Sequence, residues 1–263
     1  GWLAYDMGNL AGGYEHYQSA VAYAGRSGND QLHAYLIAGM SLWAGLHGDG
    51  GRAVKLIEEA MRLVPSRGAP AAQAWLAARE AVAWSRVGDV AAAMEALGRC
   101  ERAAERARPG EEPWPWAFPF DDARIAMYRG TVGTILAQPK IALPALQRGM
   151  KDLGPWGGAS GGPVKGGSAE AGPKLRALVL CDLAETYLFS EEVEQTCLLL
   201  SEAFATGLRM GCDRVLKRVA EIRARLDPCR HVPAVRNLED EMMTSVLDIL
   251  GSPTPTSHPK PRL

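Results

Sequence analysis

The sequence contains no pair of cysteines at CxxC spacing. Its five cysteines are odd in number and scattered along the chain, at Cys100, Cys181, Cys197, Cys212 and Cys229. A zinc site and a disulfide framework are therefore not expected. Reduced thiols are typical of proteins of the cytoplasm, so we expect this location.

Several other features are scarce. Charges interrupt every apolar stretch well before the roughly 18 residues that a membrane helix needs. No basic segment followed by an apolar one stands at the start, so a signal peptide and any membrane contact are not expected. Aromatic residues make up 7% of the chain and the net charge is −1. Charge near zero argues against a self-sufficient nucleic-acid-binding protein, since such domains are usually basic.

What the chain has in excess is alanine, which favours helices, and a glycine-based repeat. Gly8-Asn9, Gly48-Asp49 and Gly88-Asp89 lie 40 residues apart. Residues 5, 9 and 12 positions after each glycine are small or apolar, and these offsets lie on one face of a helix. They are Gly13, Tyr17 and Ala20, then Ala53, Ile57 and Ala60, then Ala93, Leu97 and Cys100.

Small residues also stand at a fixed distance before each of the three glycines. Seven residues upstream stand Gly1, Ser41 and Ala81, which would let two helices approach closely. The glycine suits the left-handed residue that ends a helix. Each unit is therefore predicted to be helix, tight turn, helix. Two degraded copies without the glycine centre on Ala137 and Glu191.

The expected fold is all-α: one array of helix pairs over residues 1–250. The predicted units are 1–26, 31–65, 71–106, 120–151 and 174–207, followed by a terminal helix pair in 212–250. Residues 151–173 are predicted to be a flexible glycine-rich insertion and 251–263 a disordered tail. The alternative is a bundle of unrelated alanine-rich helix pairs, which the strict 40-residue spacing disfavours.

The offsets within the unit resemble the tetratricopeptide repeat over roughly residues 1–206. That resemblance implies an α-solenoid, in which helix pairs stack into a right-handed superhelix. Several short phrases go further and resemble the C-terminal tetratricopeptide region of actinobacterial regulators that begin with an Xre-type helix-turn-helix domain. The phrases lie at 1–6 (GWLAYD), 116–130, 176–197 and 233–238 (PAVRNL).

This resemblance implies a regulatory module and not an enzyme. The chain starts with Gly1 instead of Met, inside the first predicted helix, so we expect it to be a piece of a longer protein. DNA would then be bound only through an N-terminal domain missing from this chain. The glycine-rich stretch 157–167 departs from the family pattern.

Two motifs are interpreted as chance matches, so no catalytic residue is predicted. Residues 158–162 match GxSxG, but that motif needs a preceding strand and here lies in the glycine-rich insertion. Residues 48–53 match the dinucleotide pattern GxGxxA, but they follow a helical pattern and coincide with a repeat turn. The five histidines form no metal-ligand pair. No cofactor or metal is expected.

A ligand is expected on the concave side, which the first helix of each unit would line. Register places on this face Trp2, Tyr5, Asp6, Tyr35, Leu42, Trp75, Val82, Arg86, Arg124, Met127, Thr131 and Glu185. Aromatic anchors mixed with charges suit an extended peptide or a helix laid in a groove. The Trp/Pro segment 113–120 would cap this groove or simply pack across the array. The basic helix 213–226 is expected to be a solvated face, with docking to an acidic partner surface or to DNA phosphate as the alternative.

The sequence thus predicts a module that senses a peptide or protein ligand and forms a homodimer, as part of a transcriptional regulator. Its response to a ligand would be a change in the pitch of the superhelix. The alternative is a protein-interaction scaffold without a DNA-linked role.

Overall fold

The computed structural model describes residues 1–65, 69–107, 121–153 and 171–251, and these ranges contain helices and turns but no strand. The helices are α1 (Trp2–Asp6), α2 (Leu10–Ser27), α3 (Asp30–Leu46), α4 (Gly50–Leu63), α5 (Pro70–Arg86), α6 (Val90–Arg106), α7 (Asp122–Ile135), α8 (Pro139–Leu153), α9 (Ala171–Phe189), α10 (Val193–Arg209), α11 (Asp213–Ala224) and α12 (Pro233–Gly251), with a short 3₁₀ turn, η1 (Asp227–Cys229), before the last. The all-α prediction is confirmed.

Consecutive helices pair as the repeat predicts, because the three glycines adopt the left-handed conformation. Gly8, Gly48 and Gly88 have φ of +75°, +81° and +79°. The next residue, Asn9, Asp49 or Asp89, begins the second helix, and its side chain accepts the N–H three residues further on, each at 2.9 Å. Each turn therefore ends one helix and caps the next with two successive residues.

The two degraded copies keep this turn without glycine. Ala137 and Glu191 have φ of +51° and +61°. The N–H of Gln138 donates to the Gly133 carbonyl at 2.8 Å, as that of Asp49 does to the Ala44 carbonyl at 2.9 Å. The repeat therefore persists where its glycine is lost, at the conformational cost that a β-carbon meets in this region.

Small residues hold the pairs close together, as the register predicts. Ala34, Ala74 and Ala81, all upstream of a turn glycine, are almost completely buried, and Ser41 donates to the Ala53 carbonyl of α4 at 2.8 Å. A β-carbon on Gly130 of α7 would lie 2.4 Å from the Leu146 side chain of α8. These positions admit no larger residue without movement of a helix.

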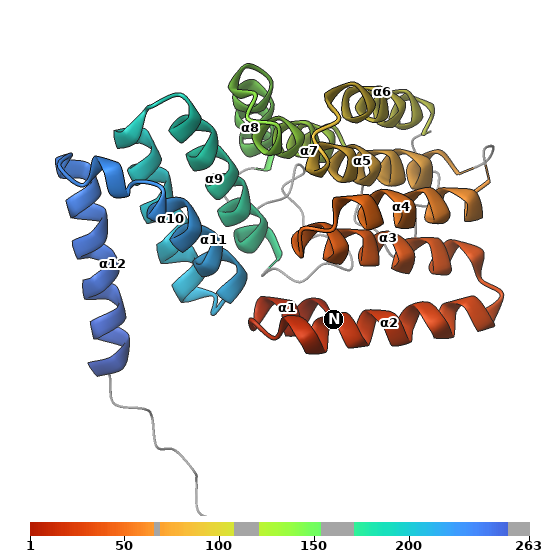
Figure 1. Cartoon of the computed structure of the whole chain (residues 1–263), viewed down its shortest axis with the longest axis horizontal. Helices are drawn as coiled ribbons and strands as arrows, with labels where there is room; N and C mark the ends of the chain where they lie inside the picture. The colour runs from red at the N-terminus through yellow and green to blue at the C-terminus, as the bar shows by residue number, and fades with distance from the viewer. Residues whose placement is uncertain (66–68, 108–120, 154–170, 252–263) are drawn as a thin grey trace, which may run out of the picture.

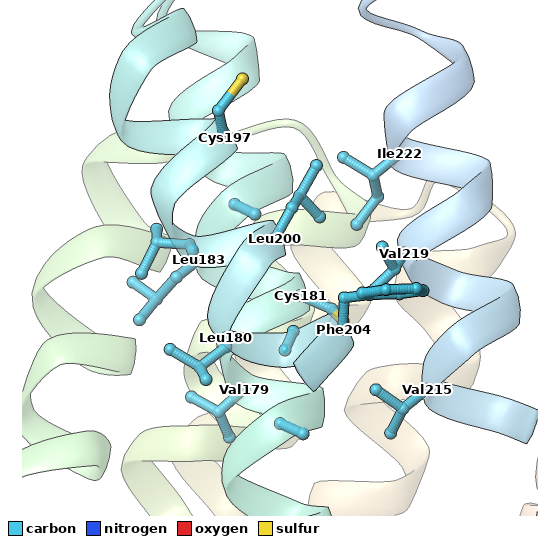
Figure 2. Close-up of a cluster of buried hydrophobic side chains, with 14 of the residues drawn as sticks. Val179, Leu180, Cys181, Leu183, Cys197, Leu200, Phe204, Val215, Val219 and Ile222 are labelled. Carbon is cyan, nitrogen blue, oxygen red and sulfur yellow. The ribbon is translucent and has the colours of Figure 1, made fainter. Parts of the chain in front are cut away.

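The largest apolar core lies in the C-terminal half of the array. Figure 2 shows side chains of α9, α10 and α11 meeting there, among them Leu180, Leu200, Phe204, Val215 and Val219. All five are buried. This packing joins α11 to the preceding helix pair.

The first helices of the units form a curved row whose two ends, α1 and α11, are in contact. The first helices of the units form a row in which α3 contacts α5, α5 contacts α7, α7 contacts α9 and α9 contacts α11. At the end of this row α11 also contacts α1, as Figure 1 shows. The inner side of this arc, formed by α1, α3, α5, α7, α9 and α11, is called the concave face below.

Some predicted boundaries change. The insertion predicted at 151–173 is shorter, because its first three residues belong to α8 and its last three to α9. The remainder, 154–170, lies outside the described residues, as do the GxSxG match, the segment 113–120 and residues 252–263 of the predicted tail. The predicted terminal pair also differs, because α11 and α12 each pack against α10 and the turn η1, which was not predicted, lies between them. No helix in the described ranges is both long and apolar enough to cross a membrane.

The strained turns give a direct test of the repeat. Replacing Ala137 by glycine should stabilise the protein by about 0.5–1 kcal/mol, because glycine adopts positive φ without steric cost. The converse change, Gly48→Ala, should destabilise it by about 1 kcal/mol. Chemical denaturation measures both, with Ala91→Gly on the exposed side of α6 as the ordinary-helix control, expected to destabilise. Loss of stability in Ala137→Gly would contradict the assigned turn.

Candidate functional site

An aromatic pair lies on the concave face between the second and third units. Tyr35 of α3 and Trp75 of α5 stack with ring centroids 5.3 Å apart and an interplanar angle of 26°. The guanidinium of Arg79, one helical turn beyond Trp75, lies 5.4 Å from the Trp75 ring centroid. Its Nη2 donates to the Ala38 carbonyl of α3 at 2.9 Å. The concave side therefore places two stacked, half-buried aromatic rings beside a fixed cation.

A small hollow adjoins this pair. Leu42, Val82, Arg79 and Arg86 line it, and its volume is about 10 Å³. A hollow of this size holds one water molecule at most. The Nη1 of Arg86 donates to the Gly45 carbonyl at 3.3 Å. The hollow also borders the buried Ala53 of α4 and Ala83 of α5, so it lies in the interface of α3, α4 and α5.

Arg86 of α5 is a cation whose charge is only partly compensated by its surroundings. Burial lowers its pKa, and the neighbouring positive charges of Arg218 and Arg79 lower it further. Its buried Nε has no hydrogen-bond acceptor among the described residues. Arg86 is thus an incompletely paired cation in the interior of the arc, which favours an incoming anion.

Carboxylates of α9 face this cation from across the arc. Asp182 accepts the hydroxyl of Thr131 at 2.7 Å, and burial raises its pKa. Glu185 pairs with Arg218 and, at 2.5 Å, with Arg225. Burial acts to lower the pKa of Arg218, but Glu185 and Asp182 together outweigh it and raise the value. Charges from three helices thus form one network.

The contact between α1 and α11 closes this network. Asp6 pairs with Arg214 of α11 at 3.3 Å and with Lys174 of α9 at 3.5 Å. The Arg214 guanidinium also lies 5.4 Å from the Trp2 ring centroid and 5.1 Å from that of Tyr5. On its other side, Tyr5 packs against Trp43 of α3 at 5.0 Å between centroids. Burial raises the Tyr5 pKa, which keeps its hydroxyl protonated.

Most of the predicted lining residues lie in or beside this network, but two are packed into the helix interfaces. Met127 is buried and its Cγ lies 2.8 Å from the β-carbon position of Gly149 on α8, so α8 covers it. Val82 is also buried, against α6, although it borders the small hollow. Arg124, also predicted to line the face, is a half-buried residue of α7, and burial lowers its pKa.

Six charged residues of the concave face were not predicted as lining: Arg79, Asp182, Lys174, Arg214, Arg218 and Arg225. The first two follow from helical spacing, because Arg79 is four residues after Trp75 and Asp182 three before Glu185. The basic helix was expected to be a solvated face, and this was wrong: Arg214, Arg218 and Arg225 pair with carboxylates of α1 and α9. The alternative, docking to an acidic partner surface or to DNA phosphate, stays a prediction.

The cysteines are placed for packing. Four of the five are buried, and burial raises the pKa of Cys100 and Cys181 to about 12. Thiolates are thus suppressed at these positions. Within the described ranges, no cluster of three or more histidine, cysteine or carboxylate side chains is placed to hold a metal ion. The GxGxxA match lies on the α3–α4 turn, between two helices.

The sequence matches no protein-family model and no curated protein.

Proposed function

We propose that this chain is a binding module of the tetratricopeptide type, a right-handed superhelix whose concave face takes an extended peptide or a segment of a partner protein. The observation that carries the proposal is the stacked pair of Tyr35 and Trp75 with Arg79 beside it. Aromatic rings next to arginine are the side chains that dominate binding energy at protein interfaces. The proposal includes no catalytic step and no cofactor.

The charges of the concave face favour a ligand with carboxylates. The cations Arg79, Arg86, Arg214 and Arg218 outnumber the facing anions Asp182 and Glu185, even when Asp6 is added. Arg86 keeps an unpaired Nε. An acidic side chain of a peptide would therefore gain a charge-assisted hydrogen bond that the free protein leaves unmade.

Binding at this face would be coupled to opening of the arc. Cations of this face already have partners within the chain: Arg214 pairs with Asp6, and Arg79 donates to the Ala38 carbonyl. A ligand that takes Arg86 or Arg214 must also compete with the carboxylates already in the network. We propose that it releases α1 from α11, which shifts the population from a closed to an open arc.

In the regulator that the sequence resembles, such a change would reposition a DNA-binding domain, and we propose this role in the cytoplasm, where the free cysteines stay reduced. The second candidate is an interaction scaffold with no DNA-linked role. The coding sequence upstream of Gly1 discriminates between them. A helix-turn-helix domain there supports the regulator, whereas a different domain supports the scaffold.

The peptide site is tested by selecting peptides from a display library on the wild-type protein and measuring their affinity by fluorescence anisotropy. Trp75→Ala should weaken binding by about tenfold or more, because truncation of an anchoring tryptophan costs at least about 2 kcal/mol. Tyr23→Ala is the control: Tyr23 is an exposed aromatic residue of α2, a second helix. Selected peptides that bind Trp75→Ala as tightly as wild type would place the site elsewhere.

We propose in addition that the module forms a homodimer through α12. The packed row of this helix, Val235, Leu238 and Met242, continues into Val246. Val246 and its neighbours Met243 and Leu247 remain exposed, by 40%, 62% and 58%. Contiguous exposed apolar side chains of this kind mark interaction surfaces.

Sedimentation equilibrium tests this dimer. The wild-type chain should sediment as a dimer and Leu247→Glu as a monomer, since a buried, unpaired carboxylate would have to be desolvated at the interface. Asn237→Glu, an exposed position on another side of α12, should remain dimeric. A monomeric wild-type protein at micromolar concentration would rule the proposed interface out.

A further inference from the structure

A second hollow, distinct from the concave face, lies between two successive second helices, α4 and α6, with α5 beneath them. Its volume is about 280 Å³, close to the lower end of the roughly 300–1,000 Å³ typical of small-molecule sites. Apolar side chains from all three helices line it: Met61 and Val64 of α4, Leu76 and Ala77 of α5, and Ala103 of α6. An apolar body of modest size would fit against them.

One edge of this hollow is basic. Arg99, Arg102 and Arg106 of α6 line it, at the spacing of one helix face. The three arginines differ in their partners. Arg99 is neutralised twice, by Glu80 and by Glu95, each at 2.7 Å. The Nη2 of Arg106 donates to the neutral amide oxygen of Gln73 at 3.2 Å.

Arg102 is the member without a partner. It is exposed, and no residue in the described part of the chain makes a hydrogen bond or ion pair with it. Both glutamates pair with Arg99, and neither Arg102 nor Arg106 pairs with a carboxylate of the described residues. Three arginines and two carboxylates leave this edge with a net charge of about +1. An apolar hollow with one uncompensated cation matches a ligand with an apolar body and a single negative charge.

From this we infer that the hollow between α4, α5 and α6 binds a small amphipathic carboxylate. The head group would accept hydrogen bonds from Arg102, with Arg106 beside it, since guanidinium matches the planar geometry of a carboxylate. The apolar body would cover Leu76 and Ala77 and displace water from them. This site shares no lining residue with the hollow on the concave side.

Isothermal titration calorimetry with octanoate tests the inference on the full chain. Wild type should bind one octanoate, and Arg102→Ala should bind it at least about tenfold more weakly through loss of a charge-assisted hydrogen bond. Arg62→Ala is the matched control. It removes the same charge from an exposed position of α4 outside the lining, and its affinity should equal that of wild type.

Two further arms separate the head group from the apolar body. Octanol, which has the same chain without the charge, and acetate, which has the charge without the chain, should each bind far more weakly than octanoate. Ala103→Leu places a larger side chain in the hollow and should abolish binding, and its thermal unfolding curve shows whether it is folded. Absence of octanoate binding to wild type, equal affinity of Arg102→Ala, or octanol binding as tight as octanoate would overturn the inference.

Discussion

One backbone conformation organises this molecule: a residue with positive φ that ends one helix, followed at once by a residue that starts the next. It occurs at Gly8, Gly48 and Gly88 and also at Ala137 and Glu191, where glycine is absent. Because two residues make the whole reversal, the helices of a pair must lie close together, and only small side chains fit between them. The buried alanines and Gly130 satisfy that requirement. Successive pairs then place their first helices side by side.

The concave face carries paired charged side chains, and apolar packing alone would not produce this arrangement. Asp6, Arg214 and Lys174 join α1 to α11 and α9, so residues from opposite ends of the chain share one charge network. Such pairs contribute to specificity of assembly more than to net stability, because each charge must lose water to form them. A network with an incompletely paired Arg86 can also be rearranged by an anionic ligand. This is the physical basis of the proposed switch.

Local pattern was enough to predict the helix pairs. The glycine spacing located the turns, the offsets located the buried face, and Tyr35 and Trp75 were placed together by register alone. The closure between α1 and α11 could not be predicted, because some 200 residues separate Asp6 from Arg214 and no periodic signal connects them. For the same reason the arginines of α11 were expected to be solvated. Met127 was misplaced by a single step around its helix, which exchanges the concave face for the interface with α8.

The closed concave face depends on the contact between α1 and α11, the two ends of the row of first helices. Spin labels on Met7→Cys, at the exposed end of α1, and Lys217→Cys, on the exposed side of α11, report the distance between them by double electron–electron resonance. With the partly exposed Cys229 replaced by serine so that it takes no label, a closed arc gives a single short distance, and adding Asp6→Asn should give a longer, broader distribution. A long or broad distribution before that change would contradict closure, and an unaltered short distance after it would contradict the role of Asp6.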